Sequence, residues 1–322
     1  MARVYRDAAA VLVLDGGLQL CRSTEPLATR LMRVLTSGWM RRLWTLQESV
    51  LSKELHFAFA DTRVLMKDLI PSTADIYIYA HLGDLAAELF RLMKRSSYGS
   101  YSIGDVARSL RWRTTSRPSD ETLAVASLLG MQPSVLVELS PERRMIRLIQ
   151  AMGRVPRNVL FLKGGKQQVP GFRWAPTSFM AAHGGSSGLQ LSTSESDAVV
   201  TPQGLEATYY ALLFPKTTFE GGRPWQLKDT KTGRLYAAGD VQPGAGSYTC
   251  DMVLTMNSIQ PGSATSCVGV RKNGQHVKSN GTFTVYCECQ RRLVLNSVAS
   301  LREDSTEVVV CHVSGELSVC VG

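Results

Sequence analysis

The spacing of apolar residues changes near residue 155, and this change limits the folds that the chain can adopt. Before that point apolar residues recur three and four positions apart, which is the period of an amphipathic helix. After it, glycine, serine, threonine and β-branched residues predominate in short runs, which is typical of strands joined by turns. The length of 322 residues allows about two cores of ordinary size. We therefore expect an N-terminal region that contains helices and a β-rich C-terminal region.

Composition excludes several classes of protein. The hydrophobic content of 44% and the charged content of 20% are ordinary for a globular chain. No apolar run reaches the roughly 18 residues that a membrane-spanning helix needs, so no membrane contact is expected. The net charge of +9 is spread thinly, without a basic stripe and stacking aromatic residues, so nucleic acid is not an expected partner. The N-terminus lacks a signal-peptide pattern, and the expected location is cytoplasmic.

The cysteines do not have the spacing of a metal site. Cys287 and Cys289 would share one face of a strand with Val285, which indicates burial in a core rather than a ligand pair. Zinc ligands usually come in pairs with two to four residues between them, and no second pair follows here. Cys311 and His312 would point to opposite faces of a strand. We therefore expect no metal, and reduced thiols that are buried.

The chain divides into three expected domains. Their boundaries are predicted at residues 1–62 (α/β), 63–152 (helical) and 153–322 (β-rich). In the first, residues 11–14 have the continuous apolar pattern of a buried parallel strand, preceded by a short helix. The other expected elements are helices over residues 27–35 and 39–51, and strands over residues 55–59, 248–254, 282–286 and 308–313.

Glycine-containing segments mark the expected turns and linkers. Lys272-Asn273-Gly274 and Asn280-Gly281 predict turns between strands, and residues 186–196 predict a flexible linker. Gly164-Gly165-Lys166 has neither the spacing nor the hydroxyl residue of a phosphate-binding P-loop, so we interpret it as a hairpin turn.

The run from Gly38 to Ser52 places two tryptophans and one glutamate on a single expected helix. At about 100° per residue, four apolar positions form one stripe that is expected to pack on the sheet: Trp39, Leu43, Leu46 and Val50. Trp44 and Glu48 lie four residues apart on the other side, with Arg41 near them. Two interpretations stay open. Either Trp44 docks against the helical region while Glu48 is solvated, or these residues form a binding or catalytic site.

Four blocks of sequence, in a fixed order, resemble those of a known family. The run Leu43-Trp44-Thr45-Leu46-Gln47-Glu48 is similar to the late signature of the fungal heterokaryon incompatibility (HET) domain. The helix and strand over residues 4–15 resemble the segment before that signature. Residues 113–121 (Arg-Thr-Thr-Ser, then Asp-Glu) and 171–178 (Arg-Trp-Ala-Pro-x-Ser) resemble later blocks. The chain is thus similar to the C-terminal part of a HET domain with its downstream region.

The resemblance implies a role in fungal non-self recognition and programmed cell death. HET domains are remotely similar to TIR domains, which have a doubly wound, flavodoxin-like sheet, and several TIR domains cleave NAD with a glutamate that follows a tryptophan. Carried over by position, Glu48 would be the catalytic carboxylate that stabilises the oxocarbenium ion. Trp44, Arg41, Asp15 and Gly16 would bind NAD as a substrate, the last two at a strand's carboxyl end. No cofactor is implied.

The opening and middle blocks of the family, Leu-Ser-Tyr-x-Trp-Gly and Trp-Ile-Asp-x-x-Cys-Ile, do not occur in this sequence. We therefore expect an incomplete TIR-like sheet, from a truncated relative, whose strand at residues 11–14 has an unpaired edge. Two functions are open. One is NAD cleavage at Glu48; the other is a non-catalytic module that assembles with a second copy or with another incompatibility protein. A third idea is that the β-rich half recognises a partner.

Overall fold

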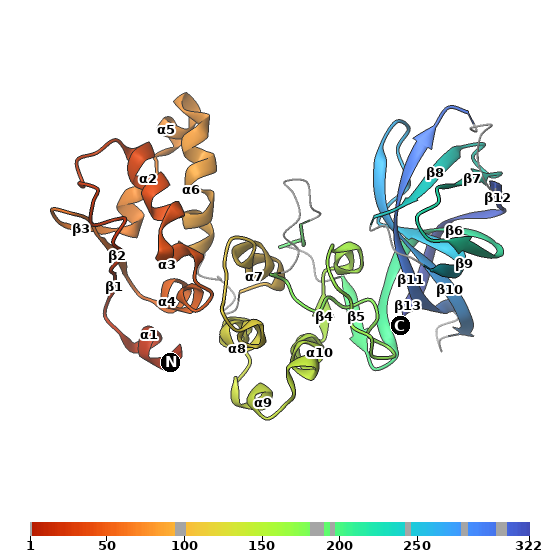
Figure 1. Ribbon diagram of the computed structural model, residues 1–322, viewed down its shortest axis with the longest axis horizontal. Coiled ribbons are helices and arrows are strands. Elements are labelled where there is room, and N and C mark those ends of the chain that lie inside the picture. Colours follow the sequence, from red (N-terminus) through yellow and green to blue (C-terminus); the bar gives the residue numbers. More distant parts are fainter. Residues whose placement is uncertain are drawn as a thin grey trace. The chain divides into compact units, whose positions relative to one another are not determined.

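The chain forms two compact units (Figure 1). The first comprises Met1–Ala151 with Ser178–Gly185, and the second comprises Met152–Thr177 with Ser186–Gly322. The computed structural model describes residues 2–93, 101–180, 190–193, 197–241, 246–277, 283–300 and 308–322. The predicted turn at Asn280-Gly281 and most of the predicted linker lie outside these residues. An α/β region followed by a β-rich region is confirmed, whereas the boundaries at residues 62 and 152 stay predictions.

A small sheet in the first unit contains three strands in the order β1-β2-β3. β1 (Val11–Val13) pairs in parallel with β2 (Leu55–Ala58), which pairs antiparallel with β3 (Arg63–Leu65). The strands predicted near residues 11–14 and 55–59 are confirmed. Within the described part of the chain β1 lies at the edge of this sheet, as expected.

The expectation that the strand at residues 11–14 is buried on both faces is wrong. Val13 is buried, but Leu12 is 51% exposed and Leu14 is 66% exposed. Because alternate residues of a strand point to opposite faces, Val13 of β1 packs inward while Leu12 lies on the outer face, and exposed Leu14 follows the strand directly. The edge strand therefore presents apolar side chains as well as unpaired backbone groups.

The predicted helix over residues 39–51 is interrupted. The helices of this part are α1 (Ala2–Asp7), α2 (Leu27–Thr36), α3 (Gly38–Arg41) and α4 (Thr45–Leu51). Between α3 and α4, Arg42 adopts an extended conformation, with φ −78° and ψ 138°. There the chain pairs with Thr114, whose N–H donates to the Arg41 carbonyl at 2.6 Å and whose carbonyl accepts from the Leu43 N–H at 3.0 Å. A contact with a distant segment thus replaces the helical hydrogen bonds.

The helical prediction for the rest of the first unit is confirmed. Its α-helices are α5 (Thr73–Ile78), α6 (Ala80–Met93), α7 (Ile103–Leu110), α8 (Glu121–Ala126), α9 (Ser134–Val137) and α10 (Pro141–Met152). The short 3-10 helices are η1 (Met66–Leu69), η2 (Pro118–Asp120) and η3 (Ser127–Leu129). Capping boxes at Ser72 and Ser102 begin α5 and α7, where each serine hydroxyl accepts from the third residue of the helix. Among the described residues, no helix combines the length and the apolar character needed to cross a membrane.

The second unit is built on a ten-stranded sheet. Its strands are β4 (Arg154–Val155), β5 (Ala198–Thr201), β6 (Gly204–Glu220), β7 (Trp225–Asp229), β8 (Leu235–Asp240), β9 (Ser247–Thr255), β10 (Ala264–Val277), β11 (Phe283–Val298), β12 (Val308–Cys311) and β13 (Val313–Val321). The pairing runs from β6 through β9, β10 and β11 to β13, which pairs again with β6. Five strands therefore close into a ring.

Aromatic side chains form the centre of the core in this unit. Phe219 stacks on Trp225 with ring centroids 4.1 Å apart, and the Trp225 indole N–H donates to the Tyr248 hydroxyl at 3.0 Å. Cys250 and Cys267 pack in the same core, and burial raises the pKa of both thiols. All seven cysteines are free, and among the described residues no group of three or more potential ligands is placed to hold a metal ion.

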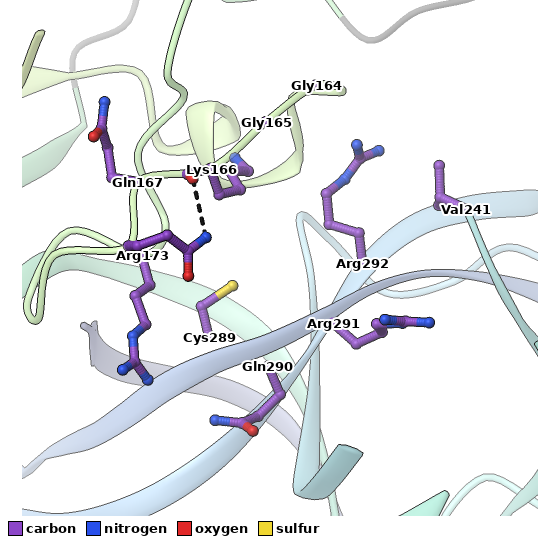
Figure 2. Close-up of a pocket in the computed structure, with 11 residues that line it drawn as sticks. Gly164, Gly165, Lys166, Gln167, Arg173, Val241, Cys289, Gln290, Arg291 and Arg292 are labelled. Carbon is purple, nitrogen blue, oxygen red and sulfur yellow. Dashed lines mark hydrogen bonds between the residues drawn. The ribbon is translucent and has the colours of Figure 1, made fainter. Parts of the chain in front are cut away.

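Two predicted turns in the second unit are wrong. The segment Lys272-Asn273-Gly274 lies inside β10, where Asn273 is the extra residue of a β-bulge between two pairs of the ladder. Gly164-Gly165-Lys166 does not join two strands. It leads from the 3-10 helix η4 (Arg157–Phe161) to an isolated bridge between Lys166 and Pro176, in the loop drawn in Figure 2. Sequence spacing alone does not separate a bulge or a bridged loop from a turn.

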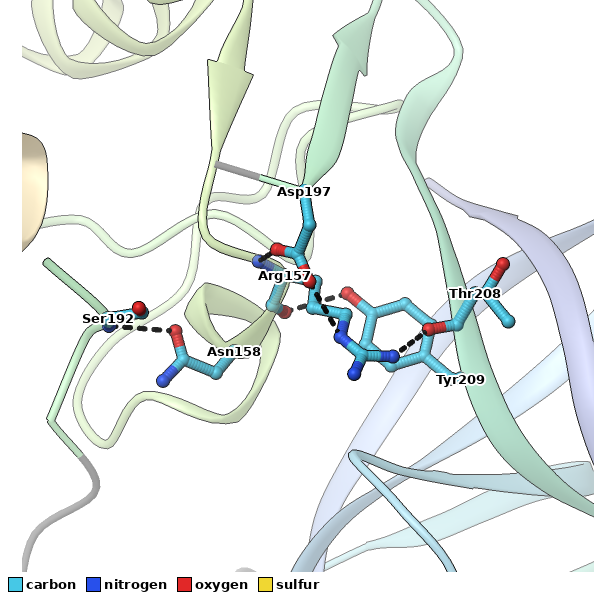
Figure 3. Close-up of polar contacts among 6 residues, drawn as sticks. All are labelled: Arg157, Asn158, Ser192, Asp197, Thr208 and Tyr209. Atoms are coloured by element: carbon cyan, nitrogen blue, oxygen red, sulfur yellow. Dashed lines mark hydrogen bonds and ion pairs between the residues drawn. The ribbon is translucent and has the colours of Figure 1, made fainter. Parts of the chain in front are cut away.

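Arg157 fixes η4 to the strands (Figure 3). The Asp197 carboxylate accepts from the Arg157 backbone N–H at 2.7 Å and lies 2.8 Å from its Nε. Arg157 Nη1 donates to the Thr208 carbonyl at 2.5 Å, and the Tyr209 hydroxyl donates to the Arg157 carbonyl at 2.7 Å. Backbone and side chain of one residue are therefore held by three others, which positions the loop that follows η4.

Ring closure makes Gly204 sensitive to substitution. An added Cβ at this position would clash with the backbone carbonyl of Val321, whereas a Cβ at Gly222 would meet nothing within 4 Å. We expect Gly204→Ala to lower the free energy of unfolding by about 3 kcal/mol, because neither backbone can move freely. Gly222→Ala, where φ is +81°, should cost only about 1 kcal/mol of left-handed strain. Urea denaturation would measure both, and equal losses would contradict the clash.

Candidate functional site

Glu48 lies half-buried on α4 and connects three helices. Its Oε2 accepts from the indole N–H of Trp39 at 2.9 Å, and its Oε1 accepts from the Tyr5 hydroxyl at 3.4 Å. Burial, with a further contribution from Glu48, raises the pKa of Tyr5, so that its hydroxyl keeps its proton. Both oxygens of the predicted catalytic carboxylate therefore have donors from α1 and α3.

Trp39 is the residue that the sequence interpretation missed. Helical spacing predicts that Trp39 lies on an apolar stripe facing away from Glu48, but the extended Arg42 redirects the chain and brings the Trp39 indole to the Glu48 carboxylate. The ring is buried and meets Phe57 of β2 edge to face, with centroids 5.6 Å apart. A buried tryptophan needs an acceptor for its N–H, and this requirement was the available signal.

Asp15 and Gly16 follow β1, and the Asp15 carboxylate accepts hydrogen bonds from the backbone of the fold. Asp15 Oδ2 accepts from the backbone N–H of Trp39 at 3.0 Å, and its Oδ1 accepts from the N–H of Gly17 at 2.9 Å. The carboxylate thereby satisfies a free donor at the start of α3. Gly16 is exposed, and a Cβ added there would meet nothing within 4 Å.

The remaining polar residues of the signature also contact other segments. The Trp44 indole N–H donates to Asp120 of η2 at 3.3 Å, so Trp44 docks against the helical region. Gln47 Nε2 donates to the Ala124 carbonyl of α8 at 2.5 Å. Thr45 Oγ1 lies 2.7 Å from the carbonyl oxygens of both Trp39 and Arg42, at the break between the helices. These side chains therefore connect the run Leu43–Glu48 to η2, to α8 and to the break between α3 and α4.

Arg113 compensates for the broken helix. Only 1% of this residue is exposed, and its Nη1 donates to the Arg42 carbonyl at 2.9 Å and to Thr45 Oγ1 at 2.6 Å. Its Nη2 lies 3.6 Å from the Met40 sulfur. Burial lowers the pKa of Arg113 to about 10, with Glu88 opposing the change, so the guanidinium stays charged at neutral pH. A carbonyl that α-helical bonding would otherwise satisfy thus receives a charge-assisted hydrogen bond.

The three motif blocks that follow the first strand contact one another. Trp44 reaches Asp120 of the second block, and Thr45 accepts from Arg113 of the same block. Glu121 accepts from the Phe179 N–H at 2.7 Å and from the hydroxyl of Ser178, the last residue of the third block. Burial raises the pKa of Glu121, while these donors oppose the change. Residues far apart in the sequence therefore meet within the first unit.

A cavity of about 400 Å³ lies beside the helix break. Its lining includes Met40, Arg41, Glu88, Trp112 and Arg113. Glu88 forms an ion pair of 3.0 Å with Nε of a neighbouring arginine on α6, and burial raises the pKa of Glu88 against that pairing. Glu48 is not among the lining residues of this cavity, so Arg41 and the predicted catalytic carboxylate do not face a common space there.

Comparison of this chain with models of protein families, with curated proteins and with solved structures finds no match in any of the three. Glu48 and Asp15 both accept hydrogen bonds from Trp39. Trp44 instead contacts Asp120, and Arg41 lines the cavity beside the helix break.

Replacement of Arg113 by Met should destabilise the first unit strongly. The substitution removes charge-assisted hydrogen bonds to the Arg42 carbonyl and to Thr45, and we expect a loss of about 3 kcal/mol in the free energy of unfolding. The control is Arg41→Gln, which removes the same charge from an exposed side chain of the preceding helix and should cost less than about 0.5 kcal/mol. Urea denaturation followed by circular dichroism would measure both; similar losses would contradict the assignment.

Proposed function

We propose that this chain is a heterokaryon-incompatibility-type protein whose N-terminal unit is a non-catalytic module, acting in the cytoplasm by assembly with a second copy. The observation that carries the non-catalytic part is the occupation of both Glu48 oxygens by Trp39 and Tyr5. The role in non-self recognition and programmed cell death follows from the resemblance of the four sequence blocks.

The surroundings of Glu48 favour a structural role over NAD cleavage. A carboxylate that stabilises an oxocarbenium ion must lie against the ribose with an oxygen free to face it. Turning the Glu48 carboxylate toward a ribose would take Oε2 away from the indole of Trp39, which is buried. Leaving a buried indole N–H without an acceptor costs about 1–3 kcal/mol. This cost supports the non-catalytic alternative.

The finer fold that we propose is an incomplete TIR-like sheet. The parallel pairing of β1 with β2, and the position of Asp15 directly after β1, support this assignment. Helices α2, α3 and α4 lie between the two strands in the sequence, as a parallel connection requires.

The proposed assembly surface is the edge of β1. This strand has no lysine, proline or bulge of the kind that normally protects an edge, and its outer face carries Leu12, with exposed Leu14 directly after the strand. Two copies of Val11–Val13 can pair antiparallel around a two-fold axis, because the same segment then supplies both sides of the interface. We therefore propose a second copy of this chain as the partner, because β1 is complementary to itself.

Purified protein should not release nicotinamide from NAD. We expect no product above the rate without enzyme, measured by chromatography beside a known NAD glycohydrolase, for the parent and for Glu48→Gln alike. The variant should lose about 1 kcal/mol of stability, since its amide cannot accept from both Trp39 and Tyr5 as a carboxylate does. Release by the parent and not by the variant would establish the catalytic alternative.

The assembly can be tested through the exposed leucines. Sedimentation velocity over a range of concentrations should detect a dimer of the parent protein, and Leu12→Lys should shift the population to monomer by placing like charges at the edge. Leu20 is 81% exposed and lies outside the sheet, so Leu20→Lys is the control that should behave as the parent does. A monomeric parent, or a dimer that tolerates Leu12→Lys, would contradict the proposed surface.

A further inference from the structure

A second cavity, of about 370 Å³, lies in the second unit between the loop after η4 and strand β11 (Figure 2). The described residues that line it include four basic side chains and no carboxylate. The basic residues are Lys166 and Arg173 from the loop, and Arg291 and Arg292 from β11. The basic side chains come from two segments, the loop after η4 and strand β11, so the positive charge is concentrated in one place.

Two of these arginines are neutralised by acidic residues outside the cavity. Arg173 forms an ion pair with Glu288, and Arg291 lies 2.8 Å from Asp240. In Figure 2 the Arg291 side chain extends along β11 away from the loop, whereas Arg292 and Cys289 extend from the strand toward the loop that carries Lys166. The charge that lacks an acidic partner is therefore concentrated at Arg292 and Lys166.

Arg292 has a guanidinium edge without a partner. Its Nε and Nη2 are buried and have no hydrogen-bond acceptor among the described residues. Burial lowers the pKa of Arg292, with the thiols of Cys289 and Cys267 as the opposing influences. The guanidinium lines the cavity, and its buried Nε–Nη2 edge has no described acceptor that would compensate its charge. An anion would offset the cost of burying this charge.

Lys166 contributes charge without a carboxylate partner. Its Nζ donates to the carbonyl oxygens of Val159, Leu160 and Trp174 at 3.4, 3.2 and 2.8 Å. Those three bonds fix the ammonium beside the cavity, and burial lowers the pKa of Lys166 to about 7. A bound anion would favour the charged form, so the lysine and the ligand would stabilise one another.

We propose that this cavity binds the phosphate group of a small phosphorylated molecule. The guanidinium of Arg292 supplies an uncompensated positive charge in the wall of the cavity, and Lys166 supplies a second positive charge beside it. The cavity volume exceeds that of one phosphate group, and exposed Gln168 at its rim offers an amide to the rest of the ligand. The proposal concerns the second unit alone and is independent of the assembly through β1.

The test measures binding of inorganic phosphate to the full chain by isothermal titration calorimetry and thermal shift, against chloride at equal ionic strength. Phosphate should bind and raise the melting temperature, and Arg292→Gln should weaken the affinity about tenfold or more. The control is Arg223→Gln, which removes one positive charge from an exposed position of the same unit and should leave the affinity unchanged. No binding by the parent, or equal affinity in both variants, would overturn the proposal.

A second pair of variants avoids any effect on folding. Gln168 is exposed and donates to the Lys166 carbonyl at 3.2 Å, so its replacement leaves the core intact. Gln168→Glu should weaken phosphate binding and Gln168→Lys should strengthen it, each by about threefold to tenfold. Unchanged affinity in both would overturn the site. Malonate tests the chemical class, and stabilisation equal to that by phosphate would overturn the assignment to phosphorylated ligands.

Discussion

The hydrogen bonds of the Arg113 guanidinium hold the break between α3 and α4 in place. A chain that leaves a helix at Arg42 takes the Arg42 carbonyl out of helical bonding beside the buried Arg113, and a carbonyl there is costly without a donor. Arg113 supplies that donor from 71 positions further along the sequence. Because Thr45 shares the guanidinium, the start of α4 is fixed by the same contact, and the positions of Trp44 and Glu48 depend on it.

The resemblance to the HET family acquires a physical meaning from these contacts. The blocks that carry it are hydrogen-bonded to one another. Thr45 bonds with Arg113, Trp44 bonds with Asp120, and Glu121 bonds with Ser178. A motif that holds distant segments together can persist without catalysis, since its loss would unfold the unit. The basic cavity of the second unit is different, because charge without a counterion contributes nothing to packing and costs free energy in the absence of a ligand.

Local periodicity predicted most of the elements and few of their connections. The strand at β1 and the helices at α2 and α6 follow from apolar spacing over their own residues, so they could be placed from the sequence. The break at Arg42 could not, because its cause is a partner in another segment. The same limit applies to the site. The spacing of Trp44 and Glu48 is local, whereas the bond from Trp39 to Glu48 arises only after that break has turned the chain.

Strand β13 gives the second unit an unusual dependence on the order of synthesis. Residues Val313–Val321 pair with both β6 and β11, so they close a ring in which their partners on β6 were made 100 to 116 residues earlier. On the ribosome, the edges of β6 and β11 that pair with β13 stay unpaired until Val321 has left the exit tunnel. For this unit the nascent chain is therefore an open sheet with two unpaired edges, which other chains or chaperones can contact until β13 is added.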